Sequence, residues 1–368
     1  MKVVRLYAYL QDNVGDDLMV GILLKRYPDV LFFFDYPESP SHGIRFESYR
    51  NFLNLSAFYR RWERINHFLN LITFNKRKDF FYRKALKYLR SKVRCSVYIG
   101  GSLYQQHTGI TVQQEEIKLE DGPLFIIGAN FGPYHDETFL KDFHEYFSRC
   151  GHVCFRDKKS YGLFSDLGNV SVAPDVVFNM NPVLPSTRGN KVLISVIDVR
   201  QRKNLQFYAD QYINFISRAC CSAVNQGLIP ILVSFCKPEG DEEMVDEIRH
   251  SLPMQVREKT EIYLYGEDGK LLSLFAESCF VIATRFHAMI LALIYHVPFF
   301  CISYNEKINN VLEDLDIHSW ACLNDLSKVN VDRLWDSNSI VPDISQYQAK
   351  ACNQFNALDR FLKAPNAI

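Results

Sequence analysis

The residues with the clearest chemical potential follow an apolar run that ends at Ala283. The stretch Ala283-Thr284-Arg285-Phe286-His287-Ala288 closes a predicted strand and opens a predicted helix, which places Arg285 and His287 at the helix N-terminus. Free backbone N–H groups and the helix dipole favour an anion there, and a guanidinium makes forked contacts with phosphate or carboxylate. His287 is a candidate general acid or base because imidazole exchanges protons near neutral pH. A buried structural histidine explains an isolated Arg-x-His equally well.

Two further predicted strand ends carry cations. About 20 residues downstream, Ser303 and Tyr304 form a polar turn, and Lys307 lies at the mouth of the next predicted helix. Arg156 follows another apolar run, where a salt bridge to Asp157 is the alternative role. Cationic strand ends in consecutive units favour an anion site over a set of separate structural roles.

The N-terminal half adds three polar turns, each placed after a predicted strand. The first turn has the asparagine and glycine of a tight turn, followed by an aspartate that could cap the next helix. The second and third turns are glycine-rich, which lets a ligand approach backbone amides closely. Ordinary turn chemistry explains each one singly, but together with Arg156 they would line one wall of a cleft. The candidate cleft residues of this half are Asn13, Gly15, Asp16, Gly100, Gly101, Ser102 and Asn130.

Short apolar runs alternate with longer amphipathic ones along the chain, which predicts parallel sheets with crossover helices. A turn-rich stretch at 181–190 separates two such series, so we expect a Rossmann-like domain over 1–182 and a second over 190–343. Residues 344–368 are expected to form a C-terminal helix that packs back across the domains. Ligands of such α/β folds bind at the carboxyl ends of the strands, here in a cleft between the domains. The expected strands are 3–10, 30–34, 96–99, 124–128, 153–155, 192–197, 229–234, 262–265, 280–283 and 299–302; the principal expected helices are 16–27, 138–149, 205–226, 242–251, 270–276, 286–295 and 344–362.

The composition is that of an ordinary globular protein. Of 368 residues, 48% are hydrophobic and 23% charged, which excludes disordered, collagenous and mucin-like chains. No apolar run reaches the roughly 18 residues of a membrane span, and the charged start does not resemble a signal peptide. The ten cysteines form no C-x-x-C pair, so we expect reduced thiols in a cytoplasmic protein and no metal site.

The net charge of zero conceals a basic segment. Residues 45–94 contain 14 basic and 3 acidic residues, interleaved with twelve aromatic ones. Such a segment, expected to be a helical insertion, can bind anionic lipid headgroups or nucleic acid. Nucleic acid is the weaker option, because no recognised nucleic-acid motif accompanies the charge. A helix packed on the body with a solvated basic face is the structural alternative.

The ordered set of these motifs resembles the polysaccharide pyruvyl transferase family, from about the first strand to about residue 317. The resemblance is weak across the basic segment and strongest in the C-terminal block. The motifs that carry it are Asn13-x-Gly15-Asp16, Gly100-Gly101-Ser102, Asn130-Phe131-Gly132-Pro133, Arg156-Asp157-x-x-Ser160, Asp175-x-x-Phe178, Arg285-Phe286-His287-Ala288, Val297-Pro298, Ile302-Ser303-Tyr304-x-x-Lys307 and Leu312-Glu313-Asp314-Leu315.

The resemblance implies a GT-B-like pair of Rossmann-like domains, with the acceptor on the N-terminal side and the donor on the C-terminal side. The enzyme would transfer the pyruvyl group of phosphoenolpyruvate to two hydroxyls of a sugar in a capsule or exopolysaccharide precursor. A cyclic ketal would form and phosphate would be released, with no metal or organic cofactor. As is usual in the family, the sugar acceptor would be a lipid-linked oligosaccharide, and the basic segment would dock on the inner face of the membrane.

The resemblance also assigns roles, since the family positions matching Arg156, Arg285, His287 and Lys307 are associated with donor binding or catalysis. We expect His287 to be catalytic and Arg156, Arg285, Lys307, Ser303 and Tyr304 to bind the donor. Two alternatives remain at this point. One is a GT-B glycosyltransferase that uses a nucleotide-sugar, and the other is a non-catalytic carbohydrate-binding assembly protein.

Overall fold

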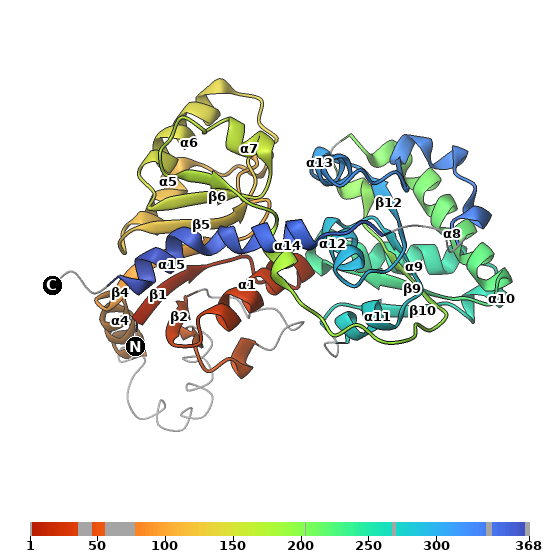
Figure 1. Cartoon of the computed structure of the whole chain (residues 1–368), viewed down its shortest axis with the longest axis horizontal. Helices are drawn as coiled ribbons and strands as arrows, with labels where there is room; N and C mark the ends of the chain where they lie inside the picture. The colour runs from red at the N-terminus through yellow and green to blue at the C-terminus, as the bar shows by residue number, and fades with distance from the viewer. Residues whose placement is uncertain are drawn as a thin grey trace.

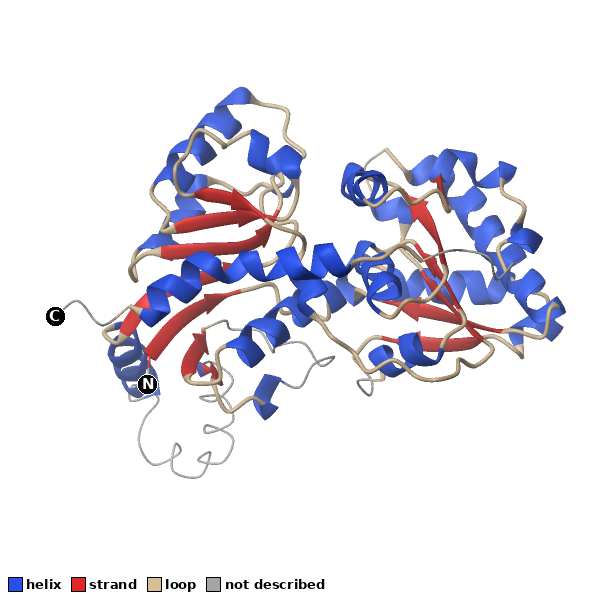
Figure 2. Cartoon of the chain, in the orientation of Figure 1, coloured by secondary structure: helices blue, strands red, loops and turns tan. Residues whose placement is uncertain are grey.

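The computed structural model describes residues 2–35, 46–55, 78–202, 204–266, 270–335 and 341–364. The chain forms two parallel β-sheets, each with helices on both faces (Figures 1 and 2). The N-terminal sheet has seven strands in the order β3-β2-β1-β4-β5-β6-β7. Its strands are β1 (Lys2–Tyr7), β2 (Val30–Phe34), β3 (Phe52–Asn54), β4 (Val93–Ile99), β5 (Leu124–Ala129), β6 (His152–Phe155) and β7 (Val170–Val172).

The C-terminal sheet has six strands in the order β10-β9-β8-β11-β12-β13. In both sheets the strand order reverses at one point, between β1 and β4 and between β8 and β11. Parallel α/β sheets bind ligands where the order reverses. The strands of this sheet are β8 (Lys191–Ser195), β9 (Ile229–Ser234), β10 (Glu261–Leu264), β11 (Phe280–Ala283), β12 (Phe299–Ser303) and β13 (Trp320–Cys322).

Helices and short 3₁₀ turns connect the strands and cover the sheets. The α-helices are α1 (Val14–Arg26), α4 (Lys78–Arg90), α5 (Val112–Glu115), α6 (Glu137–Ser148), α7 (Lys158–Gly162), α8 (Ala209–Asn225), α9 (Asp241–Ser251), α10 (Met254–Arg257), α11 (Leu271–Glu277), α12 (Phe286–Ile294), α13 (Glu306–Asp314), α14 (Ser345–Ala351) and α15 (Asn356–Lys363). The 3₁₀ turns used below are η5 (Val176–Asn179), η7 (Gln206–Tyr208), η8 (Lys237–Glu239) and η11 (Cys352–Phe355).

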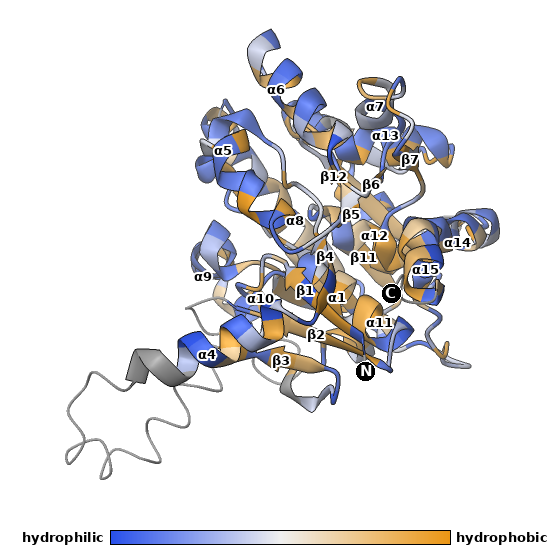
Figure 3. Cartoon of the chain, turned by 90° about the vertical axis from the view of Figure 1, so that its left-hand side faces the viewer, coloured by the Kyte–Doolittle hydropathy of each residue, from blue (hydrophilic) through white to orange (hydrophobic). Residues whose placement is uncertain are grey.

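The apolar runs of the sequence are the central strands. Every residue of β5 and of β11 is buried, as expected for parallel strands that helices cover on both faces. Figure 3 shows the hydrophobic residues concentrated on the strands, whereas α4 alternates hydrophilic and hydrophobic residues. One hydrophobic cluster joins α1 of the first sheet to α12 of the second, so the two lobes share a core. The prediction of two Rossmann-like sheets in a GT-B-like arrangement is confirmed.

The chain returns to its first lobe at the end. In Figure 1 the helices α14 and α15 run from the second lobe along the first. The buried Gln354 of η11 fixes them there: its Oε1 accepts from the N–H of Gly128 at 2.9 Å, and its Nε2 donates to the carbonyls of Ala173 at 2.8 Å and Pro174 at 3.1 Å. Asp359 of α15 also accepts from Arg26 of α1.

Several element predictions need correction. The expected helical insertion at 45–94 contains the strand β3, which pairs with β2, and α4; residues 56–77 lie outside the described part. The helix expected over 205–226 begins at Ala209, after the turn η7. The edge strands β7 and β13 were missed. Each has three residues, and none of the six is fully buried, so neither produces an apolar run.

Candidate functional site

The turn that follows β1 in the first sheet contacts the turn that follows β9 in the second sheet. Asn13 follows β1, and it forms a bridge with Cys236, which follows β9. The N–H of Val14 donates to the carbonyl of Phe235 at 3.1 Å. The carboxyl ends of strands from both sheets therefore meet in one region, which is where the predicted site residues lie.

His287 reaches this region from the first turn of α12. A Cβ atom at Gly15 would overlap with the imidazole, so only glycine lets α1 approach the histidine this closely. The Nε2 atom of His287 lies 3.7 Å from an oxygen of Asp175, an ion-pair distance rather than a hydrogen bond. That nitrogen is buried and has no hydrogen-bond partner within the described part of the chain. A proton on Nε2 is therefore not held in a hydrogen bond to another atom of the described chain.

Arg156 extends from the end of β6 into the same region. Its guanidinium donates to Asp175 and to Asn130, both at 2.8 Å. A Cβ at Gly101 would lie 2.6 Å from the guanidinium. The absence of a side chain at Gly101 therefore leaves the space that Arg156 occupies. The guanidinium carbon lies 4.7 Å from the centre of the Phe286 ring, a cation–π contact between the lobes.

Asp175 connects Arg156 to His287. It caps η5 by accepting from the N–H of Val177 at 2.9 Å. Burial raises the pKa of its carboxyl, but His287 and Arg156 outweigh burial and lower it below its usual value. Asp175 is thus an anion at neutral pH. Its site role was not predicted, although it stands in the family motif Asp175-x-x-Phe178, and that motif position was the available signal.

Asp16 corrects one expectation about the first turn. The cap of α1 is Asn13, whose Oδ1 accepts from the N–H of Gly15 at 3.1 Å. Asp16 lies in the first turn of the helix, and its carboxylate accepts from the N–H of Gly101 at 3.3 Å. Burial raises the pKa of Asp16, and this effect is larger than the lowering caused by the neighbouring His287. Gly100 precedes this contact, and a Cβ there would lie 2.8 Å from Leu103.

Lys307 closes the region from the second lobe. It lies in the first turn of α13, and its Nζ donates to the hydroxyl of Ser102 after β4. Burial and then the neighbouring Arg156 lower the pKa of Lys307 to about 7. The ammonium is the second cation of the site, and its charge depends on pH near neutrality.

The guanidinium of Arg285 is already paired with carboxylates of its own lobe. It donates to Asp241 at the start of α9, with Nε 2.9 Å from the carboxylate, and to Glu239 of η8. Arg202 also donates to Glu239 and lies 5.9 Å from the ring of Tyr304. Burial raises the pKa of Glu239, but Arg285 and Arg202 outweigh it and lower the pKa to about 2. The sequence did not indicate these two carboxylates, since no motif joins them to Arg285.

Ser303 is the last residue of β12. Its hydroxyl donates to the side chain of Asn309, within its own βα unit. The residues that converge around the backbone of Gly15 and Gly101 are therefore His287, Arg156, Asp175, Asn130, Asp16, Lys307 and Ser102. Among the described residues no group of three or more His, Cys, Asp and Glu could hold a metal ion, and the expectation that no metal or cofactor is needed stays a prediction.

Solved structures show what class of fold this is. The chain aligns with Anabaena Alr3699/HepE, in complex with UDP and glucose, at a TM-score of 0.54 and 12% identity over 99% of this chain and 98% of that one. It aligns with a mutant of S. aureus TarM, in complex with fondaparinux, alpha-GlcNAc-glycerol and UDP, at a TM-score of 0.53 and 9% identity over 98% and 99%. At such identities the likeness shows the fold alone, a two-domain α/β arrangement of the GT-B type.

The family is given by the sequence itself. A family model for polysaccharide pyruvyl transferase matches residues 13–306, so this chain belongs to the polysaccharide pyruvyl transferase family. It is accordingly a transferase, and the family implies a polysaccharide acceptor. The sequence matches no curated protein significantly. In the described part of the chain, no helix is both long and apolar enough to cross a membrane.

Proposed function

We propose that the chain transfers the pyruvyl group of phosphoenolpyruvate to two hydroxyls of a sugar, forming a cyclic ketal and releasing phosphate. The observation that carries the proposal is the convergence of Arg156, Lys307 and His287 on one region between the lobes. Two cations and an imidazole nitrogen that has no hydrogen-bond partner among the described residues suit a small molecule with two anionic groups that must be protonated. The backbone of Gly15 and Gly101 gives these large side chains room.

Donor binding would fall to Arg156 and Lys307. Phosphoenolpyruvate carries a carboxylate and a phosphate, which such cations bind through charge-assisted hydrogen bonds. Arg285 has both edges of its guanidinium engaged by Asp241 and Glu239. We therefore assign Arg285 a positioning role in donor binding. Its buried ion pairs hold the first residues of α12 in place, and this fixes the position of His287.

His287 would move the proton in the reaction. The methylene carbon of the donor gains a proton, and the adjacent carbon becomes oxocarbenium-like and is attacked by the first sugar hydroxyl. The first hydroxyl gives up its proton, which balances the proton gained by the methylene carbon. The second hydroxyl then displaces phosphate, which takes up the proton of that hydroxyl as the ketal closes. His287 either protonates the methylene carbon or removes the proton of the attacking hydroxyl. Asp175 stays ionised 3.7 Å away and stabilises the imidazolium in either case.

The test is incubation with phosphoenolpyruvate and a panel of lipid-linked mono- and oligosaccharides, with the mass of the ketal product and phosphate release as readouts. We expect the His287→Gln variant to lose roughly 10²-fold or more in turnover while it keeps the donor-induced rise in melting temperature. Turnover within a few-fold of wild type would eliminate the proton-transfer role. Stabilisation by nucleotides in place of phosphoenolpyruvate would indicate a glycosyltransferase, and sugar binding without phosphate release would indicate a non-catalytic assembly protein.

The acceptor would be presented at a membrane in this proposal. Within the basic segment, Arg83, Lys84 and Lys87 of α4 are exposed, as is Tyr88, at 64%. Cations next to an exposed aromatic ring suit an anionic headgroup layer. We propose peripheral docking on the inner face of the membrane, with a lipid-linked sugar as the substrate, in a cytoplasmic enzyme.

A further inference from the structure

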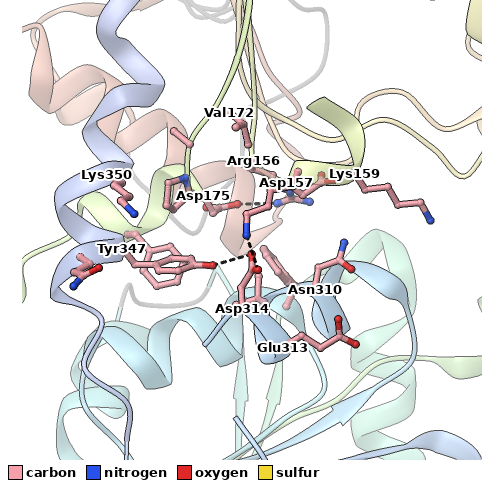
Figure 4. A pocket seen from close by; sticks show the side chains of 17 residues that line it. Arg156, Asp157, Lys159, Val172, Asp175, Asn310, Glu313, Asp314, Tyr347 and Lys350 are labelled. Atoms are coloured by element: carbon pink, nitrogen blue, oxygen red, sulfur yellow. Dashed lines mark hydrogen bonds and ion pairs between the residues drawn. The ribbon is translucent and has the colours of Figure 1, made fainter. Parts of the chain in front are cut away.

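A pocket of about 530 Å³ lies beside the candidate site, between the two lobes. The first lobe contributes the N-terminus of α7 and the η5 region, and the second lobe contributes α13. The returning helix α14 closes the third side (Figure 4). None of its α14 residues was singled out from the sequence, and the proposed donor site does not use them.

The pocket is continuous with the candidate site. Arg156 and Asp175 line it, and so does Phe286, which precedes His287. Arg156 pairs with Asp175 within the first lobe and contacts the ring of Phe286 across the lobes. A molecule in the pocket would therefore have one end next to the region where the donor is proposed to react.

The lining chemistry is that of a sugar site and not of an anion site. Tyr347 of α14 lies against Phe178 of η5, with ring centres 5.4 Å apart, which makes an aromatic wall. The opposite wall is polar, with Asn310, Glu313 and Asp314 of α13. The lining side chains carry four basic and four acidic groups, so the pocket has no net charge to attract a dianion. Aromatic faces together with amides and carboxylates suit the CH and OH groups of an uncharged sugar.

Asp314 links the three walls. One of its oxygens accepts from Lys158 of α7 at 2.8 Å, and the other accepts from the hydroxyl of Tyr347 at 3.1 Å. Both bonds are drawn in Figure 4. Burial, followed by Asp314, raises the pKa of the Tyr347 hydroxyl, so the hydroxyl remains a donor. The wall from α14 is therefore fixed to α13 as well as to the first lobe.

We propose that this pocket is the acceptor subsite and that it binds an uncharged sugar, with Tyr347 as the aromatic platform and Asn310 as a hydroxyl ligand. The inference rests on the proposed pyruvyl transfer. It adds that the C-terminal helix α14 builds part of the acceptor site, so that both lobes and the returning chain select the sugar. It also adds a specificity: because the basic and acidic groups of the lining balance, a uronic acid should not be preferred over a neutral sugar.

The test measures sugar and donor binding separately on the full chain. Saturation-transfer NMR with methyl glycosides of neutral hexoses, N-acetylhexosamines and glucuronic acid reports sugar binding, and the melting temperature with phosphoenolpyruvate reports donor binding. The variants are Asn310→Ala, Tyr347→Ala and Tyr347→Phe. The matched control is Asn356→Ala, an exposed amide at the start of α15 that is outside the pocket.

We expect a neutral glycoside to bind the wild type, and its affinity to fall roughly tenfold in Asn310→Ala, the worth of about one hydrogen bond. The affinity for the glycoside should fall further in Tyr347→Ala. It should stay close to that of the wild type in Tyr347→Phe, because the aromatic ring remains. The control and all donor shifts should be unchanged. Equal sugar binding in the Asn310 and Tyr347 variants, no glycoside bound by the wild type, or preference for the glucuronide would overturn the pocket assignment. Absence of a donor shift in the wild type would instead overturn the proposed reaction.

Discussion

At the scale of single residues, the site is built around two glycines that leave room for larger side chains. Gly15 admits the imidazole of His287, and Gly101 admits the guanidinium of Arg156. Neither glycine has a positive φ angle, so the requirement at each position is space and not backbone conformation. This separates the two positions from the ordinary turn glycines of the chain.

Gly15→Ala should therefore damage activity more than folding. The methyl group displaces His287, and a shift of about 1 Å in a reacting group can lower turnover by roughly 10²-fold. Circular dichroism should show an intact fold, since alanine is favourable in the first turn of α1. Gly162→Ala is the control, because nothing lies within 4 Å of a Cβ there. Similar turnover in the two variants would contradict this account of His287.

Lys307 should give the enzyme a pH dependence. Its pKa of about 7 means that the ammonium loses its proton as the pH rises through neutrality, and with it the attraction for the donor. We expect kcat/KM for phosphoenolpyruvate to fall about tenfold per pH unit on the alkaline side, because this ratio reports the free enzyme. Lys307→Arg should remove that alkaline limb, since a guanidinium stays charged. A flat wild-type profile from about pH 6 to 9 would refute the assignment.

At the scale of elements, the end of the chain completes the first lobe. The segment from α14 to α15 supplies no strand, yet its Gln354 satisfies backbone groups at the ends of β5 and β6 and before η5. These are the strand ends from which the Asn130 turn and Arg156 project. The helices therefore stabilise the lobe and support the site from behind.

Gln354→Leu should be strongly destabilising. The substitution leaves the N–H of Gly128 and the carbonyls of Ala173 and Pro174 buried without this partner. We expect the free energy of unfolding to fall by about 3 kcal/mol, as measured by urea denaturation. Asn353→Leu is the matched control, since that side chain is exposed in the same turn. A loss below about 1 kcal/mol would mean that η11 contributes little to the lobe.

At the scale of the whole molecule, the question is how a protein with no net charge could meet a membrane. The helix α4 of the basic segment lies at one end of the first lobe, next to β4 and close to the N-terminus (Figure 1). The candidate site lies at the opposite ends of the same strands, facing the second lobe. Docking through α4 would thus leave the cleft accessible.

Charge reversal at Arg83, Lys84 and Lys87 should abolish docking. Each cation near an anionic surface contributes about 1 kcal/mol, so replacing three with glutamate should lower affinity by at least roughly 10²-fold. Flotation with vesicles containing phosphatidylserine measures this, and binding should also weaken in high salt. Turnover of a soluble acceptor is the control and should be unchanged. Equal flotation of wild type with neutral and anionic vesicles would leave only the interpretation of α4 as a surface helix.

The sequence was sufficient for the central strands of both sheets and for the strand ends at which the candidate residues lie. Apolar runs such as β5 and β11 are read directly, because strands covered on both faces must be hydrophobic throughout. The chemistry-bearing residues follow those runs, so Arg156, His287 and Lys307 could be identified by their position after a strand. The short edge strands β7 and β13 could not be identified from the sequence, because three partly exposed residues give no apolar pattern.

What the sequence determined by itself is local: which segments are strands, which residues stand at their ends, and the family to which their order belongs. What the tertiary structure decided is which of those residues share one space. It placed Asp175 between Arg156 and His287, engaged Arg285 with Asp241 and Glu239, and brought Tyr347 against the cleft from the far end of the chain. The physical reason is that such contacts join residues far apart in the chain, and their distances depend on how the two sheets and the returning helices pack, which no local pattern encodes.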